Sequence, residues 1–176
     1  MVILGIDPAI RTTGYGVIRA EDGRMEILDC GVIRNPAKAP HSECLRRLNG
    51  GIRELIARFE PAAASLEEPF LGRNASTAII LGMARGAIVA ALAEAGVPCY
   101  AYSPRTAKKS AVGSGSAEKE QVAMMMAAQF HIEVGEIPLD ATDALALAVC
   151  HGQLAMRGEQ LAMRGEQLAA LLTKPI

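Results

Sequence analysis

The chain has 176 residues, of which 51% are apolar, and a formal net charge of −1. This length is enough for one domain with a substantial core, and the charge excludes a chain that is basic throughout. Positive charge is nevertheless concentrated between residues 70 and 119, where six Lys or Arg residues stand against two Glu residues. The four widely spaced cysteines and the lack of a signal-peptide pattern at the N-terminus indicate reduced thiols in a cytoplasmic protein.

Three short strands joined by tight turns are predicted first, over residues 1–7, 14–19 and 25–33. This spacing favours an antiparallel meander. Residues 42–59 carry apolar side chains at three- and four-residue steps, which predicts a helix before Pro61. The following strand, residues 62–68, is apolar almost to its end and is therefore expected near the middle of the sheet.

The second half of the chain is predicted to be mainly helical. A long helix is expected over residues 74–96, and its Arg85 and Glu94 favour a buried or interface helix over a membrane span. The later elements are a strand at 98–102, a short helix capped by Ser103 before Pro104, a helix from a Ser116 cap to about residue 130, and a helix starting near Asp140. The order β-β-β-α-β-α-β-α-α-α predicts an α/β fold, with one mixed five-stranded sheet flanked by helices.

The C-terminus contains a duplication, because residues 153–159 recur unchanged as residues 160–166. The period of seven would allow a coiled coil, but two copies are few, and Gly158 and Gly165 disfavour it. A solvent-exposed helical tail or a frayed extension without chemistry is the preferred interpretation. The predicted organisation is thus a domain over residues 1–152 and a tail over residues 153–176.

Four carboxylates lie where predicted elements begin or end. Asp7 and Glu67 each end an apolar strand, whereas Asp140 and Asp143 fall in the first turn of the last helix, three residues apart on one face. Keeping such acids charged at the ends of buried elements requires a partner. Divalent cations suit carboxylate oxygens, and a pair of them about 3.5–4 Å apart can clamp a phosphodiester during hydrolysis.

Each acid also has an ordinary structural explanation. Asp7 precedes Pro8 as a turn residue would, Glu67 could form a solvated pair with Glu68, and Asp140 could simply cap its helix with help from Asp143. The run after Asp143 is wholly apolar, however, and a helix that is apolar all round is buried. Its acidic start is therefore more compatible with a site than with bulk solvent.

Five groups of motifs follow one another along the chain. They are Gly5-Ile6-Asp7-Pro8 with Thr13-Gly14-Tyr15-Gly16-Val17-Ile18, Glu67-x-x-Phe70-x-x-x-Asn74, Leu81-Gly82-x-Ala84-Arg85-Gly86, Gly113-x-Gly115-x-Ala117-Glu118-Lys119-x-Gln121-Val122 and Asp140-Ala141-x-Asp143-Ala144-Leu145-Ala146. In order and spacing, from residue 2 to about residue 151, they resemble the RuvC family of bacterial Holliday-junction resolvases, whose fold is similar to that of ribonuclease H.

The resemblance implies an endonuclease that uses two Mg²⁺ ions per site, with Mn²⁺ as a possible substitute, and makes paired symmetric nicks in four-way junction DNA. Asp7, Glu67, Asp140 and Asp143 match the family's catalytic, metal-binding acids. The resemblance also implies a homodimer through the helix at 74–96, a branch-migration motor of RuvA and RuvB as a partner, and a role in recombination and repair.

Other matched residues are implied to bind DNA. Phe70 matches an aromatic residue that stacks on bases. The alternative is that its side chain packs in the hydrophobic core. Lys108 and Lys119 match basic residues used in DNA handling and catalysis, and a Lys beside the scissile phosphate can stabilise developing charge. Three looser candidates for backbone contacts, which could equally form a solvated basic face, are Arg73, Arg105 and Lys109.

One departure from the family pattern lies next to Asp7, where Ala9-Ile10 replaces the common Gly-Ser. Ala9 has a Cβ where the common Gly has none, so the backbone geometry of the loop after Asp7 is not predicted. Two other functions compete. An actin-like ATPase or sugar kinase also begins with a Gly-Ile-Asp strand but needs an adenosine site and a longer chain. A junction-binding protein without catalysis would be expected to lack one or more of the four acids.

Overall fold

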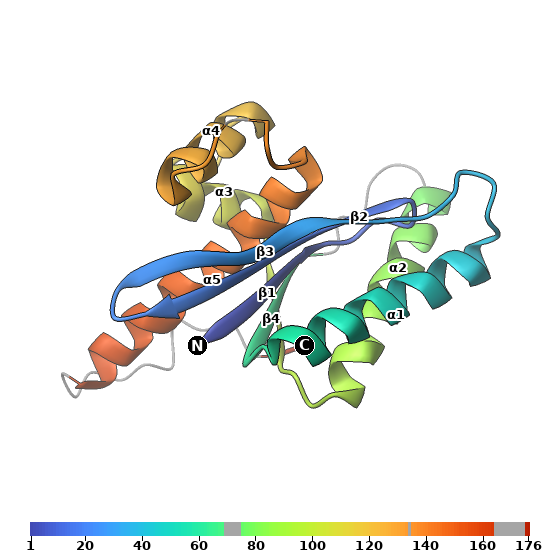
Figure 1. The fold of residues 1–176 in the computed structure, drawn as a ribbon, viewed down its shortest axis with the longest axis horizontal. Helices are drawn as coiled ribbons and strands as arrows, with labels where there is room; N and C mark the ends of the chain where they lie inside the picture. Colours follow the sequence, from blue (N-terminus) through green and yellow to red (C-terminus); the bar gives the residue numbers. More distant parts are fainter. Residues whose placement is uncertain (69–74, 134, 164–174) are drawn as a thin grey trace.

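The computed structural model describes residues 1–68, 75–133, 135–163 and 175–176, and within them one mixed sheet is covered by helices on both faces (Figure 1). The predicted α/β class and the predicted order of elements are confirmed. The elements are β1 (Val2–Asp7), β2 (Thr12–Glu21), β3 (Arg24–Arg34), α1 (His41–Phe59), β4 (Ala63–Glu67), α2 (Ala75–Glu94), β5 (Cys99–Tyr102), α3 (Pro104–Val112), α4 (Lys119–Phe130) and α5 (Leu139–Met163).

The strand order in the sheet is β3-β2-β1-β4-β5. The first three strands form the predicted antiparallel meander, whereas β4 runs parallel to β1 and β5 runs parallel to β4. The last register pair of β1 and β4 joins Ile6 to Leu66. Because parallel strands end at the same edge of a sheet, Asp7 and Glu67 emerge side by side on neighbouring strands.

The alternation of side chains along β1 and β4 decides which face these two acids occupy. Ile6 and Leu66 belong to the core cluster formed with α1 and α2. Their successors, Asp7 and Glu67, therefore point to the opposite face, where Ile3 packs with α4 and α5. The acids thus share the face that α5 covers.

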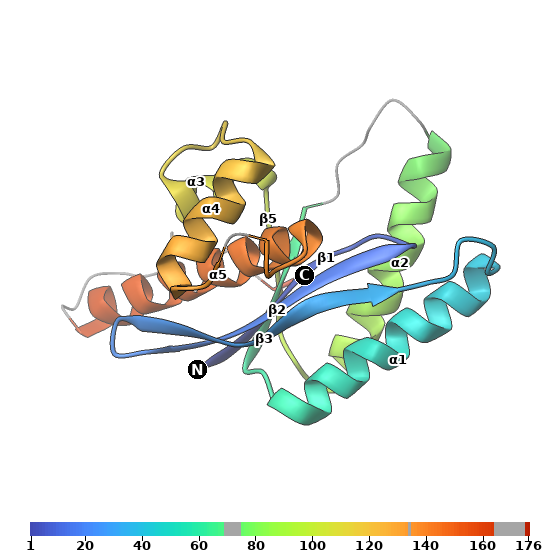
Figure 2. The same ribbon diagram turned by 45° about the horizontal axis from the view of Figure 1, so that its top comes forward.

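Glycines allow α5 to lie directly on the strands, as its path across the sheet shows (Figure 2). A Cβ built on Gly14 would stand 1.9 Å from the carbonyl oxygen of Asp140, and one on Gly5 would stand 2.0 Å from that of Ala144. These positions admit no side chain unless the helix moves away. At these two positions the backbone of α5 is therefore seated directly against β1 and β2.

The opposite face is packed by side chains from α1 and α2. Leu48 and Ile52 of α1 and Ile88 and Leu92 of α2 are completely buried. Among the described helices, α2 alone is long and apolar enough to cross a membrane by length and composition. This helix is partly buried, since 22% of its apolar stretch is buried and its buried side chains pack in the core shared with α1, which is compatible with the predicted buried or interface helix.

Two helix starts test the predicted caps. Ser103 caps α3 as predicted, since its Oγ accepts a hydrogen bond of 3.1 Å from the backbone N–H of Thr106. The prediction of Ser116 as the cap of α4 is wrong, because Glu118 is the capping residue and the helix starts at Lys119. The backbone N–H of Glu118 donates to Oε1 of Gln121 at 2.9 Å, so the cap is a Glu–Gln pair.

The last helix passes residue 152 without a break and continues to Met163. It therefore includes the first copy of the duplicated segment, and Gly158 does not end it. The second copy begins within the helix, and its residues 164–166 lie outside the described residues. The boundary between a domain over 1–152 and a tail over 153–176 stays a prediction.

Candidate active site

The four acids predicted from the sequence come together at one edge of the sheet. Asp7 and Glu67 are the last residues of β1 and β4, and Asp140 and Asp143 lie at the start of α5. The pKa of Asp7 is raised from 3.8 to about 7 by burial and then by the charges of Glu67, Asp143 and Asp140. All three other acids thus lie close enough to Asp7 to repel its negative charge.

The position of Asp140 follows from the packing of α5. Gly14 is the register partner of Asp7 on β2, and it is also the residue against which the Asp140 carbonyl rests. The start of the helix is therefore held directly beside the end of β1. Asp143 follows one turn later, on the same face of the helix.

Lys119 is the cation that enters this cluster. Its Nζ lies 2.5 Å from Oδ2 of Asp143, and the side chain of Asp143 is mostly buried. The hydrogen bond to Asp143 raises the pKa of Lys119, and the charges of Asp7 and Asp140 add to this effect. The first residue of α4 is thereby linked to the first turns of α5, on the open side of the acids.

Lys108 supports the same region from α3. Its Nζ donates a hydrogen bond of 2.6 Å to the carbonyl of Ala117, two residues before Lys119. The positive charge of Lys108 also lowers the pKa of Glu67, although burial raises that pKa overall. Lys108 therefore fixes the segment that carries Lys119 and lies within electrostatic range of the acids.

Arg85 lies at the site, although no role at the site was predicted for it. Its guanidinium donates a hydrogen bond to the backbone carbonyl of Glu67, and its charge lowers the pKa of the Glu67 carboxyl. It reaches the site from α2, on the other side of the sheet. The available signal was a single cation inside an otherwise apolar stretch, which is costly to keep there without a partner.

The remaining described basic candidates show no direct interaction with the four acids. Arg105 and Lys109 are exposed on α3, and the Arg105 side chain lies against Gly115. Neither residue is among the charges that shift the pKa of Asp7 or Glu67. Phe70 and Arg73 lie outside the described residues.

The loop after Asp7 is closed by Thr13. The Thr13 hydroxyl donates to the Ala9 carbonyl at 2.6 Å and accepts from the Ala9 N–H at 3.2 Å. Neither Ala9 nor Ile10 has a positive φ. The replacement of Gly-Ser by Ala-Ile is thus accommodated with ordinary backbone conformations.

The donor set suits a hard divalent cation, since it consists of carboxylate oxygens only. Among the described residues, no three such groups are arranged closely enough to enclose an ion by themselves. Mg²⁺ commonly uses one or two protein carboxylates and completes its shell with waters and substrate phosphate oxygens. Burial first, and the neighbouring carboxylates after it, raise the pKa values of Asp7 and Glu67 in spite of Lys119, and a divalent cation would favour the charged form of both acids.

Comparison with known proteins gives a consistent assignment. The family model described as crossover junction endodeoxyribonuclease RuvC matches residues 3–151. A relative of that description from Chlorobaculum parvum is 45% identical over 150 residues, covering 85% of this chain and 80% of the relative. One from Chloroflexus aurantiacus is 40% identical over 155 residues, covering 88% and 94%.

Solved structures agree. RuvC of Thermus thermophilus in complex with a Holliday junction substrate superposes with a TM-score of 0.83 at 36% identity, covering 90% of this chain and 96% of that one. The yeast mitochondrial resolvase Ydc2 shares the fold, with a TM-score of 0.64 at 14% identity. The order of motifs, the architecture and these matches lead to one conclusion: the chain belongs to the RuvC family of crossover junction endodeoxyribonucleases.

Proposed function

We propose that this protein resolves four-way DNA junctions by paired symmetric nicks, and that Asp7, Glu67, Asp140 and Asp143 form the two-metal hydrolytic site. Family membership makes the protein an endodeoxyribonuclease of recombination and repair. The observation that carries the assignment of residues is the meeting of four acids around Asp7, with Lys119 on their open side.

Divalent-metal dependence follows from the family, and we propose Mg²⁺ as the working ion, with Mn²⁺ as a substitute. The four acids would hold two ions, which supply a nucleophilic water and neutralise charge on the scissile phosphate. Asp7 would be the central carboxylate of the set, because the charges of Glu67, Asp143 and Asp140 all raise its pKa. Glu67 and the two α5 acids would flank it, and rigid elements hold all four in place.

Lys119 is assigned the role of binding the phosphate of the DNA substrate. In the protein alone it pairs with Asp143, and a phosphate in the site offers its ammonium a second anion. Lys108 is assigned mainly to holding the Ala117 segment in place, with a secondary electrostatic role toward DNA. Phe70, Arg73, Arg105 and Lys109 are proposed DNA contacts on the basis of the resemblance.

The proposed homodimer would use α2. On the outer face of this helix, Ile79 is 65% exposed and Met83 is 39% exposed, and a Cβ built on Gly82 or Gly86 would meet open space. A two-fold dimer would present two sites to the two symmetric strands of a junction. Gly86→Glu should then give monomers in light-scattering measurements, whereas a monomeric wild-type protein would contradict the dimer.

Two further assignments rest on the family alone. They are a branch-migration motor of RuvA and RuvB as a partner, and a cytoplasmic location. The activity of the relatives on DNA is compatible with both.

The test offers synthetic four-way junctions and linear duplexes of the same sequence, with Mg²⁺ or Mn²⁺. Symmetric nicking of the junction, sparing of the duplex, and loss of nicking in Asp7→Asn are expected. Glu68→Gln is the matched control, since Glu68 neighbours Glu67 but is not among the acids that raise the pKa of Asp7. ATP hydrolysis without nicking would overturn the proposal in favour of an ATPase. Binding without nicking would favour a non-catalytic junction-binding protein.

A further inference from the structure

The connection between β3 and α1 is fastened to the loop that follows Asp7. Arg11 donates from Nη1 to the carbonyls of Pro36 and Ala39, at 2.8 and 3.0 Å. In return, Nδ2 of Asn35 donates to the carbonyl of Ile10 at 2.8 Å, and the Asn35 N–H donates to the carbonyl of Arg11 at 2.9 Å. The position of this connection is therefore fixed relative to the acids.

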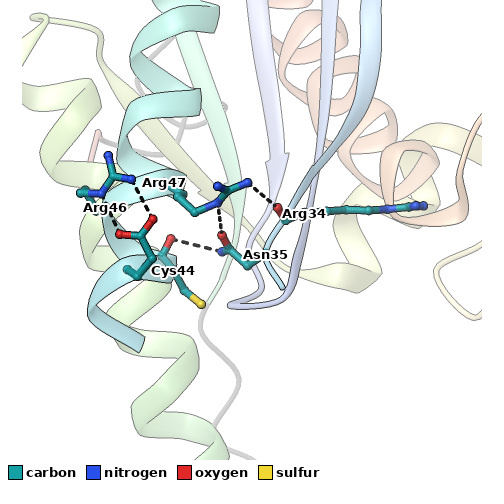
Figure 3. Close-up of polar contacts among 6 residues, drawn as sticks. Arg34, Asn35, Cys44, Arg46 and Arg47 are labelled. Carbon is teal, nitrogen blue, oxygen red and sulfur yellow. Dashed lines mark hydrogen bonds and ion pairs between the residues drawn. The ribbon is translucent and has the colours of Figure 1, made fainter. Parts of the chain in front are cut away.

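Four exposed cations gather on this connection and on the first turns of α1, and we call them the β3–α1 patch: Arg34, Lys38, Arg46 and Arg47. Figure 3 labels three of them: Arg46 and Arg47 lie on α1, on one side of Asn35, and the side chain of Arg34 extends in the opposite direction, away from α1. Arg47 donates to Oδ1 of Asn35 at 3.2 Å, and Arg46 pairs with Glu43, the single acid among residues 34–47. Within the described residues, no hydrogen bond or ion pair engages the side chains of Arg34 and Lys38.

Charge is separated along the sheet. At the far end, the β2–β3 hairpin over residues 19–26 carries three acids and two cations. On the second half of α1, Arg53 pairs with Glu94 and Arg58 pairs with Asp29. Arg19, Arg53 and Arg58 are thus neutralised by protein carboxylates. Of the four patch cations, Arg46 alone forms an ion pair with a carboxylate among the described residues.

The patch lies at the catalytic end of the sheet. Asp7 pairs with Gly14 on β2, and Thr12, two residues earlier on β2, pairs with Arg34 on β3. With strands about 4.8 Å apart and a rise of about 3.3 Å per residue, Arg34 starts on the order of 12 Å from Asp7. The helices α3 and α4 lie on one side of the start of α5 and the start of α1 lies on the other (Figures 1 and 2).

From these observations we infer that the β3–α1 patch binds the sugar-phosphate backbone of a duplex arm of the junction, beyond the nucleotides held by the acids. The inference rests on the proposed function and adds a second DNA-binding surface opposite the cations of α3 and α4. A duplex carries one negative charge per roughly 1.7 Å of its axis, so an arm passing the patch presents several phosphates to it. Such contacts release counterions and are independent of sequence.

The test measures junction binding against salt concentration in an Asp7→Asn background, where cleavage does not remove the substrate. Arg34→Gln with Lys38→Gln removes two charges whose side chains make no hydrogen bond or ion pair with described residues. The matched control, Arg19→Gln with Arg24→Gln, removes two charges from the far hairpin. Losing two phosphate contacts should lower the slope of log K against log salt by about 1 to 2, with roughly tenfold weaker binding at moderate salt. The control should leave the slope unchanged.

Binding to junctions with arms of different length tests whether the patch contacts a duplex arm. With arms longer than a helical turn, the patch variant should bind more weakly than the control, and with arms of a few base pairs the difference should vanish. An equal loss on short arms would overturn the assignment to an arm. The charge-conserving variant Arg34→Lys with Lys38→Arg should retain binding, and its failure to do so would show that altered folding explains the effect instead.

Failure of the inference and failure of the proposed function are distinguishable. If wild-type protein nicks junctions but the patch variant keeps the full salt slope, the inference is overturned and the function stands. If wild-type protein does not nick junctions, the proposed function is overturned, and the binding slopes still decide whether the patch contacts DNA.

Discussion

The two faces of the sheet are packed in opposite ways. On one face, Gly5 and Gly14 bring the backbone of α5 into direct contact with the strands. On the other, large side chains such as Leu48, Ile52 and Ile88 fill the space between strands and helices. Side chains can adjust their rotamers, whereas two backbones in contact cannot adjust without moving a whole element. The glycine face therefore fixes position, and the side-chain face supplies buried apolar area.

This difference matters because the four acids sit on the glycine face. Two acids come from strands and two from α5, so their spacing is set by how closely the helix approaches the sheet. A displacement of about 1 Å in a catalytic group can cost on the order of a hundredfold in rate. The substitutions below probe each face in turn.

The largest effect is expected from Gly14→Ala, which prevents the close approach of α5 to β2. The new Cβ would stand 1.9 Å from the Asp140 carbonyl, so α5 must move. We expect nicking to fall by about a hundredfold or more and the free energy of unfolding to fall by about 3 kcal/mol. Thermal melting and single-turnover nicking would measure these effects. Near wild-type activity would show that the packing of α5 does not set the site.

Leu48→Ala probes the other face. Removing this fully buried side chain from α1 should cost about 2–5 kcal/mol of stability through lost burial and a cavity. At a temperature where the variant stays folded, its nicking rate should remain close to that of wild type. A large loss of rate in folded protein would contradict the separation of roles between the faces.

Asp7→Asn probes the charge crowding on the glycine face. The pKa of Asp7 is about 7 in the folded protein and 3.8 in the unfolded reference. Between these values the folded state holds a proton that the unfolded chain has released, so this acid lowers stability as the pH rises from 3.8 to about 7. In chelator-treated protein, the variant should gain about 2 kcal/mol at pH 8 and little at pH 4. Denaturant titrations at both pH values give the comparison, and a loss of stability at pH 8 would contradict it.

Arg85→Ala removes a contact through which the side-chain face reaches the site. Loss of a charged hydrogen bond to the Glu67 carbonyl should cost about 1.5 kcal/mol, or roughly tenfold in nicking. Added guanidinium ion should restore part of the rate, because it can fill the vacated position. A variant that binds junctions and nicks them normally would remove Arg85 from the site.

The smallest effect is expected from Gly50→Ala, a helix-interior glycine of α1 with open space around its Cβ position. Alanine should raise stability by about 0.5–1 kcal/mol through helix propensity and leave nicking unchanged. Together with Gly14→Ala, this variant separates the general cost of replacing glycine from the specific cost of moving α5. A destabilised Gly50→Ala protein would weaken that separation.

The sequence predicted what depends on local pattern. Hydrophobic periodicity located the strands and helices, and the strand-end positions of Asp7 and Glu67 suggested that they could meet. It could not predict which strands are neighbours without the family resemblance, since pairing is a property of the whole chain. The contact of Gly14 with Asp140 was not predicted either, because it depends on the path of α5 across the sheet.

The wrong prediction and the missed residues also have physical reasons. Ser116 has the chemistry of a cap, but Glu118 and Gln121 satisfy the first turn of α4 with a reciprocal pair two residues later. Arg85 looked like an ordinary cation because its partner is a backbone carbonyl, which has no sequence signature. The β3–α1 patch falls outside the basic segment from 70 to 119 that the charge count emphasised.

The order in which the acids occur along the chain has a consequence for protein synthesis. During translation, Asp7 and Glu67 leave the ribosome in the first half of the chain, whereas the two acids of α5 follow near its end. A nascent or truncated polypeptide without α5 carries half of the proposed ligand set, and the exposed strands on its glycine face have no helix to cover them. On the proposed assignment, competence to cut DNA therefore arises only when the last helix docks.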